Sequence, residues 1–327
     1  MVCLTCLKEL STTSGQEHHD SCLRRLFDTT AVRSRLAFTR AEVFQDFRAI
    51  HTRRMSISGV QPKLMLHVED KELRPVATGG RYILKPSPES FPGAAENEHV
   101  SMLLGALAGV DTPTCSLVRF ADGELAYLVR RFDRAPNGDK IHQEDLTQIL
   151  AISRTTDGEF KYGRSYEEVG ETIYTATDGK LGVVLRFFER VVFSYLIKNG
   201  DYHLKNISLR RGPGTKGLSY TDLTPNYDSL NTSLYSPKER VTALDMYKDG
   251  EYSSSYQMLG FHCQVDFVDL GRRMGLPTKA AVQAISKVVR KKDQMKQLLR
   301  ASYMAPVRQA QFIADVDERA MALAMVP

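Results

Sequence analysis

A long apolar segment in the second half of the chain places the strongest constraint on the fold. Residues 181–198 are apolar around most of the circumference that a helix would have, so we expect a buried central helix there. With 327 residues, 42% of them apolar and 25% charged, the chain can bury a sizeable core around such a helix. The polar stretch from Asn199 to Asn206 follows at once.

The remaining elements divide the chain into a strand-rich first part and a helical second part. Residues 23–50 read as helical, a helix at 96–107 ends at Gly109, and helices dominate from Asp133 onward. Short strands are expected at 63–68, 82–85, 116–120 and 126–132. This order predicts an α+β, bilobal fold with a small strand-rich N-lobe, a larger helical C-lobe and a hinge near residues 131–136. A protein kinase has this order, and so do many other α+β folds.

Composition narrows the classes of function. No stretch of about 18 apolar residues occurs, so no transmembrane helix is expected. The N-terminus lacks the basic and apolar regions of a signal peptide, and we therefore expect a cytoplasmic protein with no membrane partner. Basic residues gather at 24–54 and 287–300. Solvated helix faces are the simpler interpretation of these clusters, and direct nucleic-acid binding with a steep salt dependence is the alternative. Hydrolase motifs such as Gly-x-Ser-x-Gly and His-Glu-x-x-His do not occur.

The polar loop after the central helix carries the chemistry. Asp201 and Asn206 stand five residues apart, which is the spacing of a protein-kinase catalytic loop. A carboxylate at the first position orients the attacking hydroxyl or accepts its proton, and an amide oxygen at the second holds Mg²⁺. Lys205 is placed to neutralise the γ-phosphate during transfer. His203 is expected to fix the loop by hydrogen bonding rather than to act as a base.

Two charged residues outside this loop fit the same reaction. Asp228 ends a short apolar segment, where a kinase keeps its second metal-binding aspartate, although an isolated Asp in a turn is usually structural. Lys85 ends the expected strand at 82–85, in the position of the strand lysine of kinases. Glu98 on the following helix is its expected ion-pair partner. The alternative is that Lys85 is a solvated charge.

A loop rich in small residues precedes the first expected strand. Small residues let backbone N–H groups approach phosphate oxygens, so the stretch from Ser56 to Lys63 is a candidate nucleotide-covering loop. It contains one glycine rather than the three of a Gly-x-Gly-x-x-Gly loop, and taken alone it could be an ordinary turn. The residues assigned to the nucleotide here are Ser58, Gly59, Val60, Gln61 and Lys63.

Cysteine and histidine residues near the N-terminus have the spacing of a zinc site. Cys3 and Cys6 form a Cys-x2-Cys pair, and His19 and Cys22 form a His-x2-Cys pair. His18 competes with His19 for the fourth position. The alternative is a small knuckle of reduced thiols that is held by packing alone.

Taken together, these segments resemble the HipA family of bacterial toxin kinases. The resemblance rests on the strings at residues 56–63, 82–86, 96–99, 130–134, 142–145, 199–206 and 227–229, which run in the order of the family. It implies ATP and Mg²⁺ as cofactors, with Asp201 as catalytic base, Asn206 and Asp228 as metal ligands and Lys85 on the ATP phosphates. It also implies that the backbone at Arg130 and Phe132 holds adenine. Three further segments take roles by the same resemblance: Ser56 and Ser58 as autophosphorylation sites, Gln143 and Asp145 near the substrate, and residues 152–164 as a mobile loop.

The resemblance further implies a domain plan and partners. Residues 1–22 would be the zinc knuckle, 23–132 the N-lobe and 133–327 the C-lobe. The early start of the phosphate loop resembles the short HipT kinases, which act with a helix-turn-helix HipB-like antitoxin and a small HipS-like protein, so that DNA is contacted only indirectly. Kinases of this family phosphorylate aminoacyl-tRNA synthetases, and the tryptophanyl enzyme is favoured here. The alternative is a catalytically silent scaffold that acts with a DNA-binding antitoxin.

The two loop serines suggest a form of self-regulation. Phosphate on Ser56 or Ser58 would add about two negative charges where the ATP phosphates must lie, and we expect this to block nucleotide binding. The alternative is that these serines only satisfy hydrogen bonds of a turn.

Overall fold

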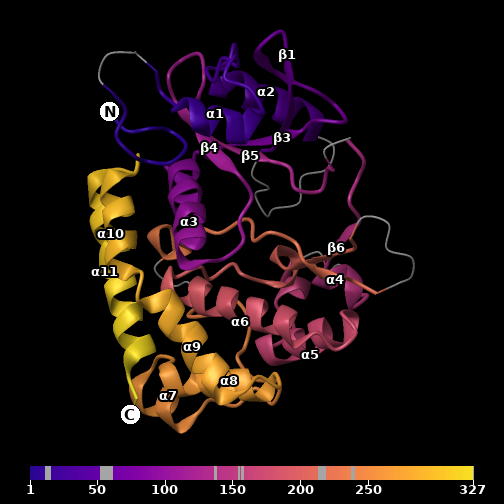
Figure 1. Ribbon diagram of the computed structural model, residues 1–327, viewed down its shortest axis with the longest axis vertical. Coiled ribbons are helices and arrows are strands. Elements are labelled where there is room, and N and C mark those ends of the chain that lie inside the picture. Colours follow the sequence, from indigo (N-terminus) through magenta and orange to yellow (C-terminus); the bar gives the residue numbers. More distant parts are fainter. Residues whose placement is uncertain are drawn as a thin grey trace.

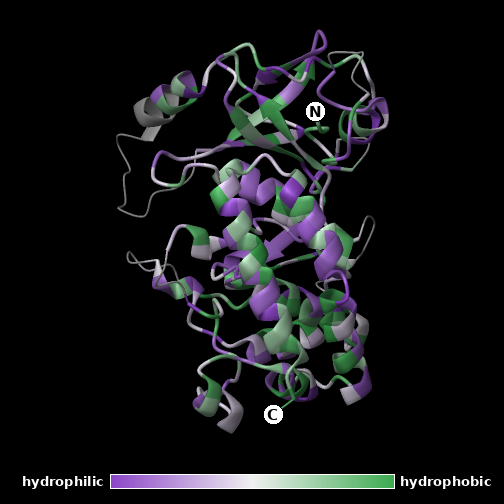
Figure 2. Ribbon diagram, turned by 90° about the vertical axis from the view of Figure 1, so that its left-hand side faces the viewer, coloured by the Kyte–Doolittle hydropathy of each residue, from purple (hydrophilic) through white to green (hydrophobic). Residues whose placement is uncertain are grey.

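The computed structural model describes residues 1–11, 16–51, 62–135, 138–153, 155, 158–212, 219–236 and 240–326, without the side chains of 46–51. The predicted phosphate-loop residues 56–61 lie outside these ranges, as do residues 154, 156 and 157 of the predicted mobile loop. Strands gather at one end of the long axis and helices at the other, and the C-terminus lies at the helical end (Figures 1 and 2). None of the described helices is both long and apolar enough to cross a bilayer.

The first part of the chain builds an antiparallel sheet of five strands in the order β2-β1-β3-β5-β4. Its elements are α1 (Asp20–Phe27), α2 (Arg40–His51), β1 (Leu64–Glu69), β2 (Glu72–Pro75), β3 (Tyr82–Pro86), α3 (Ala94–Ala108), β4 (Cys115–Arg119) and β5 (Leu125–Arg130).

Alternation of side chains gives this sheet two different faces. On β3, Tyr82 and Leu84 point into a cluster with α1, which supplies Leu26 and Phe27. Residues of the opposite parity face α3 and a cavity, and they include Ile83 and Lys85 on β3 and Tyr127 and Val129 on β5. The register pairs Ile83 with Val129 and Lys85 with Tyr127, so these four side chains form one patch.

The remaining elements cover the central helix α6 (Leu181–Leu196), which is buried along most of its length. A second, three-stranded sheet has the order β6-β7-β8. In chain order the elements of this part are β6 (Gln143–Asp145), α4 (Leu146–Ile149), η1 (Glu159–Lys161), α5 (Tyr166–Ala176), α6, η2 (Leu204–Asn206), β7 (Ser208–Arg210), β8 (Asp222–Leu223), η3 (Thr232–Leu234), α7 (Ser254–Leu259), α8 (Gln264–Arg273), α9 (Thr278–Val289), α10 (Lys292–Ala301) and α11 (Pro306–Ala324).

Most of the elements expected from the sequence are present. The four expected strands and the helices at 96–107 and 181–198 are confirmed, each within two residues at either end. The continuous helical stretch expected at 23–50 is wrong, because α1 ends at Phe27. Asp28 caps it, with a left-handed φ of 64° and an N–H that donates to the carbonyl of Arg24. The chain then runs extended, and Arg33 and Arg35 bridge to Glu72 and Arg119. Strand β2 was not expected, since its four residues carry little apolar pattern.

Helix α3 joins the sheet to the helical part, as Figure 1 shows. Its C-terminus is capped by Gly109 in the left-handed conformation, with a φ of 83°. The amide of Asn97 makes two hydrogen bonds to the backbone of Asn231, at 2.8 and 3.0 Å. Asn231 in turn donates to Asp315 on α11, which pairs with Lys198 at the end of α6. This buried polar network fixes one side of α3 to the segment that leads into the predicted catalytic loop.

Candidate active site

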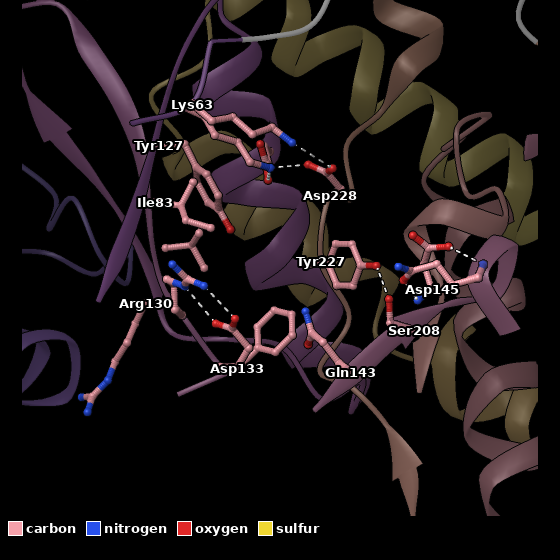
Figure 3. A pocket seen from close by; sticks show the side chains of 16 residues that line it. Lys63, Ile83, Tyr127, Arg130, Asp133, Gln143, Asp145, Ser208, Tyr227 and Asp228 are labelled. Atoms are coloured by element: carbon pink, nitrogen blue, oxygen red, sulfur yellow. Dashed lines mark hydrogen bonds and ion pairs between the residues drawn. The ribbon is translucent and has the colours of Figure 1, made fainter. Parts of the chain in front are cut away.

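A cavity of about 320 Å³ lies between the five-stranded sheet and the segment around Asp228 (Figure 3). The sheet supplies an apolar wall of Ile83 and Val129 together with the ring of Tyr127. Polar residues line the other side, among them Gln143, Asp145, Gln148, Ser208 and Tyr227. A pocket with an apolar wall and a few convergent polar groups has the character of a ligand site.

Lys85 lines this cavity and lies between two carboxylates. Its Nζ lies 2.5 Å from Oε1 of Glu98 on α3 and also contacts Oδ1 of Asp228. The ion pair expected between Lys85 and Glu98 is therefore confirmed. Lys63 approaches the other oxygen of Asp228 at 3.7 Å. Both Lys85 and Glu98 are buried, so the pair is held in a low-dielectric setting.

Burial and charge act differently on the groups of this cluster. Burial alone would raise the pKa of Asp228, but Lys85 and Lys63 outweigh it and hold that pKa well below its usual range. Burial raises the pKa of Glu98 to about 7, and Lys85 limits the rise. Burial also opposes the charge of Lys85, yet Asp228 and Glu98 raise its pKa above the ordinary value. Of the two carboxylates that contact Lys85, Asp228 thus stays ionised over the wider pH range.

The predicted catalytic loop begins where α6 ends and turns sharply at Lys198, whose φ is +50°. Three groups converge on Oδ1 of Asp201: the hydroxyl of Tyr162 donates at 2.7 Å, Nε2 of His203 lies at 3.2 Å, and Nζ of Lys161 lies at 3.7 Å. Burial lowers the pKa of His203, so its imidazole is neutral near pH 7. A neutral imidazole at this distance lies directly beside the carboxylate of Asp201. The loop-fixing role expected for His203 stays a prediction.

Asn206 is tied back onto the same loop. Its Nδ2 donates to the backbone carbonyl of Asp201 at 2.8 Å, which leaves Oδ1 without a partner among the described residues. The hydroxyl of Tyr227 donates to the carbonyl of Lys205 at 2.9 Å, and its ring stacks on Phe132 with centroids 5.7 Å apart. Tyr227 thereby connects the catalytic loop to the cavity.

Not every predicted site residue points into the cavity. The side chain of Arg130 extends away from it (Figure 3) and forms a bidentate pair with Asp28 at 2.8 Å. The ring of Phe132 does line the cavity, and its peptide N–H and C=O have no hydrogen-bond partner within the described ranges. Lys205 makes no side-chain ion pair with the described residues. Gln143 and Asp145 both line the cavity.

Sequence reasoning missed several of the residues that shape the site. The resemblance to the HipA family implies a mobile loop at Tyr162, and nothing in the spacing of this residue indicates that it reaches Asp201. The apolar wall could have been found, because side-chain alternation puts Ile83 on the same face as Lys85. Arg131 and Asp133, which form a bidentate pair at 2.9 and 2.7 Å, also line the cavity.

The N-terminal cysteines and histidine form a second cluster, and its residues do not line the cavity. The ligand atoms of Cys3, Cys6, His19 and Cys22 lie within 4.8 Å of one another. Nδ1 of His19 is 3.4 Å from Sγ of Cys6, close to the edge of about 3.5 Å that a tetrahedral zinc site would have. Nε2 of His19 donates to the carbonyl of Glu9 at 3.0 Å, which leaves Nδ1 facing the cluster. Nδ1 of His18 is instead engaged with Thr5 at 3.0 Å, so the geometry favours His19 as the fourth residue.

A buried lysine–glutamate pair beside an Asp-x4-Asn loop and a further aspartate defines a site of the protein-kinase type. The chain belongs to the HipA-like C-terminal domain family, whose characteristic sequence matches residues 55–295. It is 32% identical over 304 residues to a Haemophilus influenzae protein named as a candidate kinase, covering 86% of this chain and 85% of that protein. It is 26% identical over 258 residues to the serine/threonine-protein kinase toxin HipA of Shewanella oneidensis, covering 73% of this chain and 55% of the toxin.

Solved structures show the same fold. A chain from the Shewanella oneidensis complex of HipA, HipB and operator DNA superposes with a TM-score of 0.61 at 21% identity, covering 82% of this chain and 64% of that one. The Helicobacter pylori proinflammatory kinase CtkA superposes with a TM-score of 0.50 at 13% identity, covering 79% and 90%. The predicted HipA-like fold of mixed helix and sheet is confirmed. The closer relation to HipT and the three-part domain plan stay predictions, and the proposed boundary after residue 22 falls inside α1.

Proposed function

We propose that this chain is a serine/threonine protein kinase that transfers the γ-phosphoryl group of ATP to a protein hydroxyl. The observation that carries the proposal is Lys85, buried between Glu98 and Asp228 at the wall of the cavity. In kinases this lysine binds ATP phosphates and must be held by a glutamate of the adjoining helix. The sheet with α1 to α3 would then be the N-lobe and the helical part the C-lobe.

The cavity offers distinct surroundings for the two ends of ATP. Ile83 and Val129 form the apolar wall that a purine ring needs. The peptide of Phe132, which has no hydrogen-bond partner among the described residues, would supply a donor and an acceptor for the edge of that ring. The phosphates would lie towards Lys63 and Lys85. The predicted covering residues Ser58, Gly59, Val60 and Gln61 belong to the same proposal, although they lie outside the described residues.

The donor set fits Mg²⁺. Asp228 is an ionised carboxylate, and Asn206 presents a carbonyl oxygen because its NH₂ group is engaged with Asp201. Hard oxygen ligands of this kind are the ones Mg²⁺ prefers. When bound, the ion would neutralise charge on the phosphates.

The protein's own groups account for the handling of the proton. Asp201 would orient the substrate hydroxyl and take its proton at a carboxylate oxygen, while Tyr162 and His203 hold that carboxylate in place. Lys205 follows on the same loop and would offset negative charge on the transferred group.

The biological role proposed for the chain is that of a toxin in a toxin–antitoxin system. Supporting observations are the names of its relatives, one a kinase toxin and one part of a complex with HipB and operator DNA. A HipB-like antitoxin and a small HipS-like protein are the proposed partners, and tryptophanyl-tRNA synthetase is the favoured substrate. Autophosphorylation is proposed at Ser56 and Ser58.

We also propose that Zn²⁺ is bound by Cys3, Cys6, His19 and Cys22. The support is the convergence of their ligand atoms and the hydrogen bond that orients His19. Metal analysis of the purified protein tests this assignment, and the absence of stoichiometric zinc would refute it.

Phosphate transfer to purified synthetases tests the proposed activity. Labelled ATP with Mg²⁺ and the tryptophanyl enzyme should give labelled synthetase with the wild type and none with Asp201→Asn. The competing function is a catalytically silent scaffold, which predicts no transfer in either case. Calorimetry then separates a kinase that needs a partner, which still binds ATP, from a scaffold that does not.

A further inference from the structure

The N-terminal knuckle, defined here as residues 1–11 and 16–22, packs against one face of α3. Leu4 is fully buried in a cluster with Ala95 and Met102 of α3 and with Leu117 of β4. Ala95 and Met102 are seven residues apart and therefore lie on the same stripe of the helix. His99 lies between them on that stripe.

Hydrogen bonds connect the same parts. Nε2 of His99 donates to the backbone carbonyl of Thr5 at 3.1 Å. The hydroxyl of Thr5 shares a hydrogen bond with Ser116 of β4 at 2.9 Å. The N–H of Leu117 donates to the carbonyl of Leu4 at 2.9 Å, so the knuckle also pairs with the edge of the sheet.

A third attachment anchors the knuckle to the helical part of the molecule. The hydroxyl of Tyr303, just after α10, donates to the carbonyl of Val2 at 2.5 Å. In Figure 1 the N-terminal segment lies beside the ends of α3 and α10. The knuckle therefore occupies the corner where α3, the edge of the sheet and the C-terminal helices meet.

The proposed metal ligands enclose the residues that make these contacts. Leu4 and Thr5 are the two residues between Cys3 and Cys6, so a metal bound by both cysteines fixes the turn that touches α3. His19 and Cys22 come from the start of α1 and close the loop from the other side. Without the metal, this turn would depend on its packing and on the hydrogen bonds of Leu4 and Thr5.

We propose that the zinc-bound knuckle is a brace for α3, which keeps Glu98 against Lys85. The inference rests on the zinc site proposed above and goes beyond it in assigning a consequence to the metal. Glu98 directly precedes His99, so a shift of the stripe that faces the knuckle would also move the ion pair. The polar network at Asn97 already attaches another side of α3 to the helical part of the molecule. The brace therefore limits rotation of α3 about its own axis and is not what attaches the helix.

Hydrogen–deuterium exchange tests the brace without reference to activity. The full chain would be measured as purified, after removal of metal by a chelator, and after zinc is returned. We expect amides of residues 94–108 to exchange about tenfold faster without metal and to recover with zinc, while α6 stays unchanged. His99→Leu should retain stoichiometric zinc and still show the faster exchange in α3. Cys6→Ser removes one of the proposed metal ligands. Its matched control is Cys263→Ser, which replaces a buried thiol far from the cluster in sequence.

Each outcome separates the brace from the site on which it rests. If the purified protein holds no zinc, the zinc site fails and the brace fails with it. If zinc is present but its removal leaves exchange in α3 unchanged, the site stands and the brace is overturned. Faster exchange in α6 to the same degree as in α3 also overturns it, because the metal would then stabilise the whole fold.

Discussion

Replacing Glu98 by Gln probes the charge on which the proposed site depends. The amide keeps the volume of the side chain and can still accept a hydrogen bond from Lys85, so that only the charge of the 2.5 Å contact is lost. Lys85 would then pair with Asp228 alone and compete with a metal ion for that carboxylate. We therefore expect a weaker site for ATP with Mg²⁺ but an intact fold.

The size of the effect follows from the two kinds of hydrogen bond. A charged hydrogen bond contributes about 1.5–3 kcal/mol and a neutral one about 0.5–1.5 kcal/mol, so the loss is about 1–2 kcal/mol. This corresponds to a fall of about 5- to 30-fold in kcat/KM for ATP. Initial rates at varied ATP concentration measure it, and a melting curve checks the fold.

Glu96→Gln is the matched control, since this residue lies on the same helix and its carboxylate faces Ser87 rather than Lys85. It should behave as the wild type in the same assay. Equal kcat/KM for the wild type, Glu96→Gln and Glu98→Gln would refute the reasoning.

The ionisation of Glu98 adds a pH signature to the same experiment. Its pKa is raised to about 7 by burial, so the carboxylate takes up a proton and the charged pair is lost as the pH falls through that value. Between about pH 8 and 6 the wild type should approach the rate of Glu98→Gln, whose own profile lacks this step. Parallel profiles would contradict the assignment.

Two further predictions concern groups that lie away from the ion pair. Tyr162→Phe removes a 2.7 Å hydrogen bond to Asp201, so kcat should fall about tenfold while the affinity for ATP stays unchanged. An increase in kcat would instead mean that Tyr162 blocks the site. Burial lowers the pKa of His262 to about 4, so the unfolded chain takes up a proton between about pH 6.5 and 4 that the folded chain does not. The free energy of unfolding should therefore fall by about 2 kcal/mol more between pH 7 and 5 in the wild type than in His262→Gln, as measured by chemical denaturation, and equal slopes would contradict this.

The pattern of apolar and polar residues within each segment was sufficient to predict the helices and strands that hold the site. The apolar circumference of 181–198 and the strands expected at 82–85 and 126–132 follow from the pattern of neighbouring residues, and the structure confirms these elements. The pairing of Lys85 with Glu98 could also be predicted, because a strand and the helix that follows it are adjacent in the fold.

Contacts that depend on tertiary packing could not be predicted. Tyr162 reaches Asp201 across 39 residues, and the contact depends on how the segment before α5 packs over the end of α6. The side chain of Arg130 turns away from the cavity because Asp28, at the end of a helix more than a hundred residues earlier, offers it a bidentate partner. Spacing alone could not separate His18 from His19, because the choice depends on which ring faces Thr5 and which faces Cys6 in the folded chain.

Intact-mass spectrometry after incubation with ATP and Mg²⁺ tests the central claim most directly. The wild-type chain should gain phosphate, with the label mapped to Ser56 or Ser58, and Asp201→Asn should gain none while still binding ATP. Phosphate on both proteins would contradict the role of Asp201 as the catalytic base. The absence of both phosphate and ATP binding in the wild type would contradict the account of this site as a kinase centre.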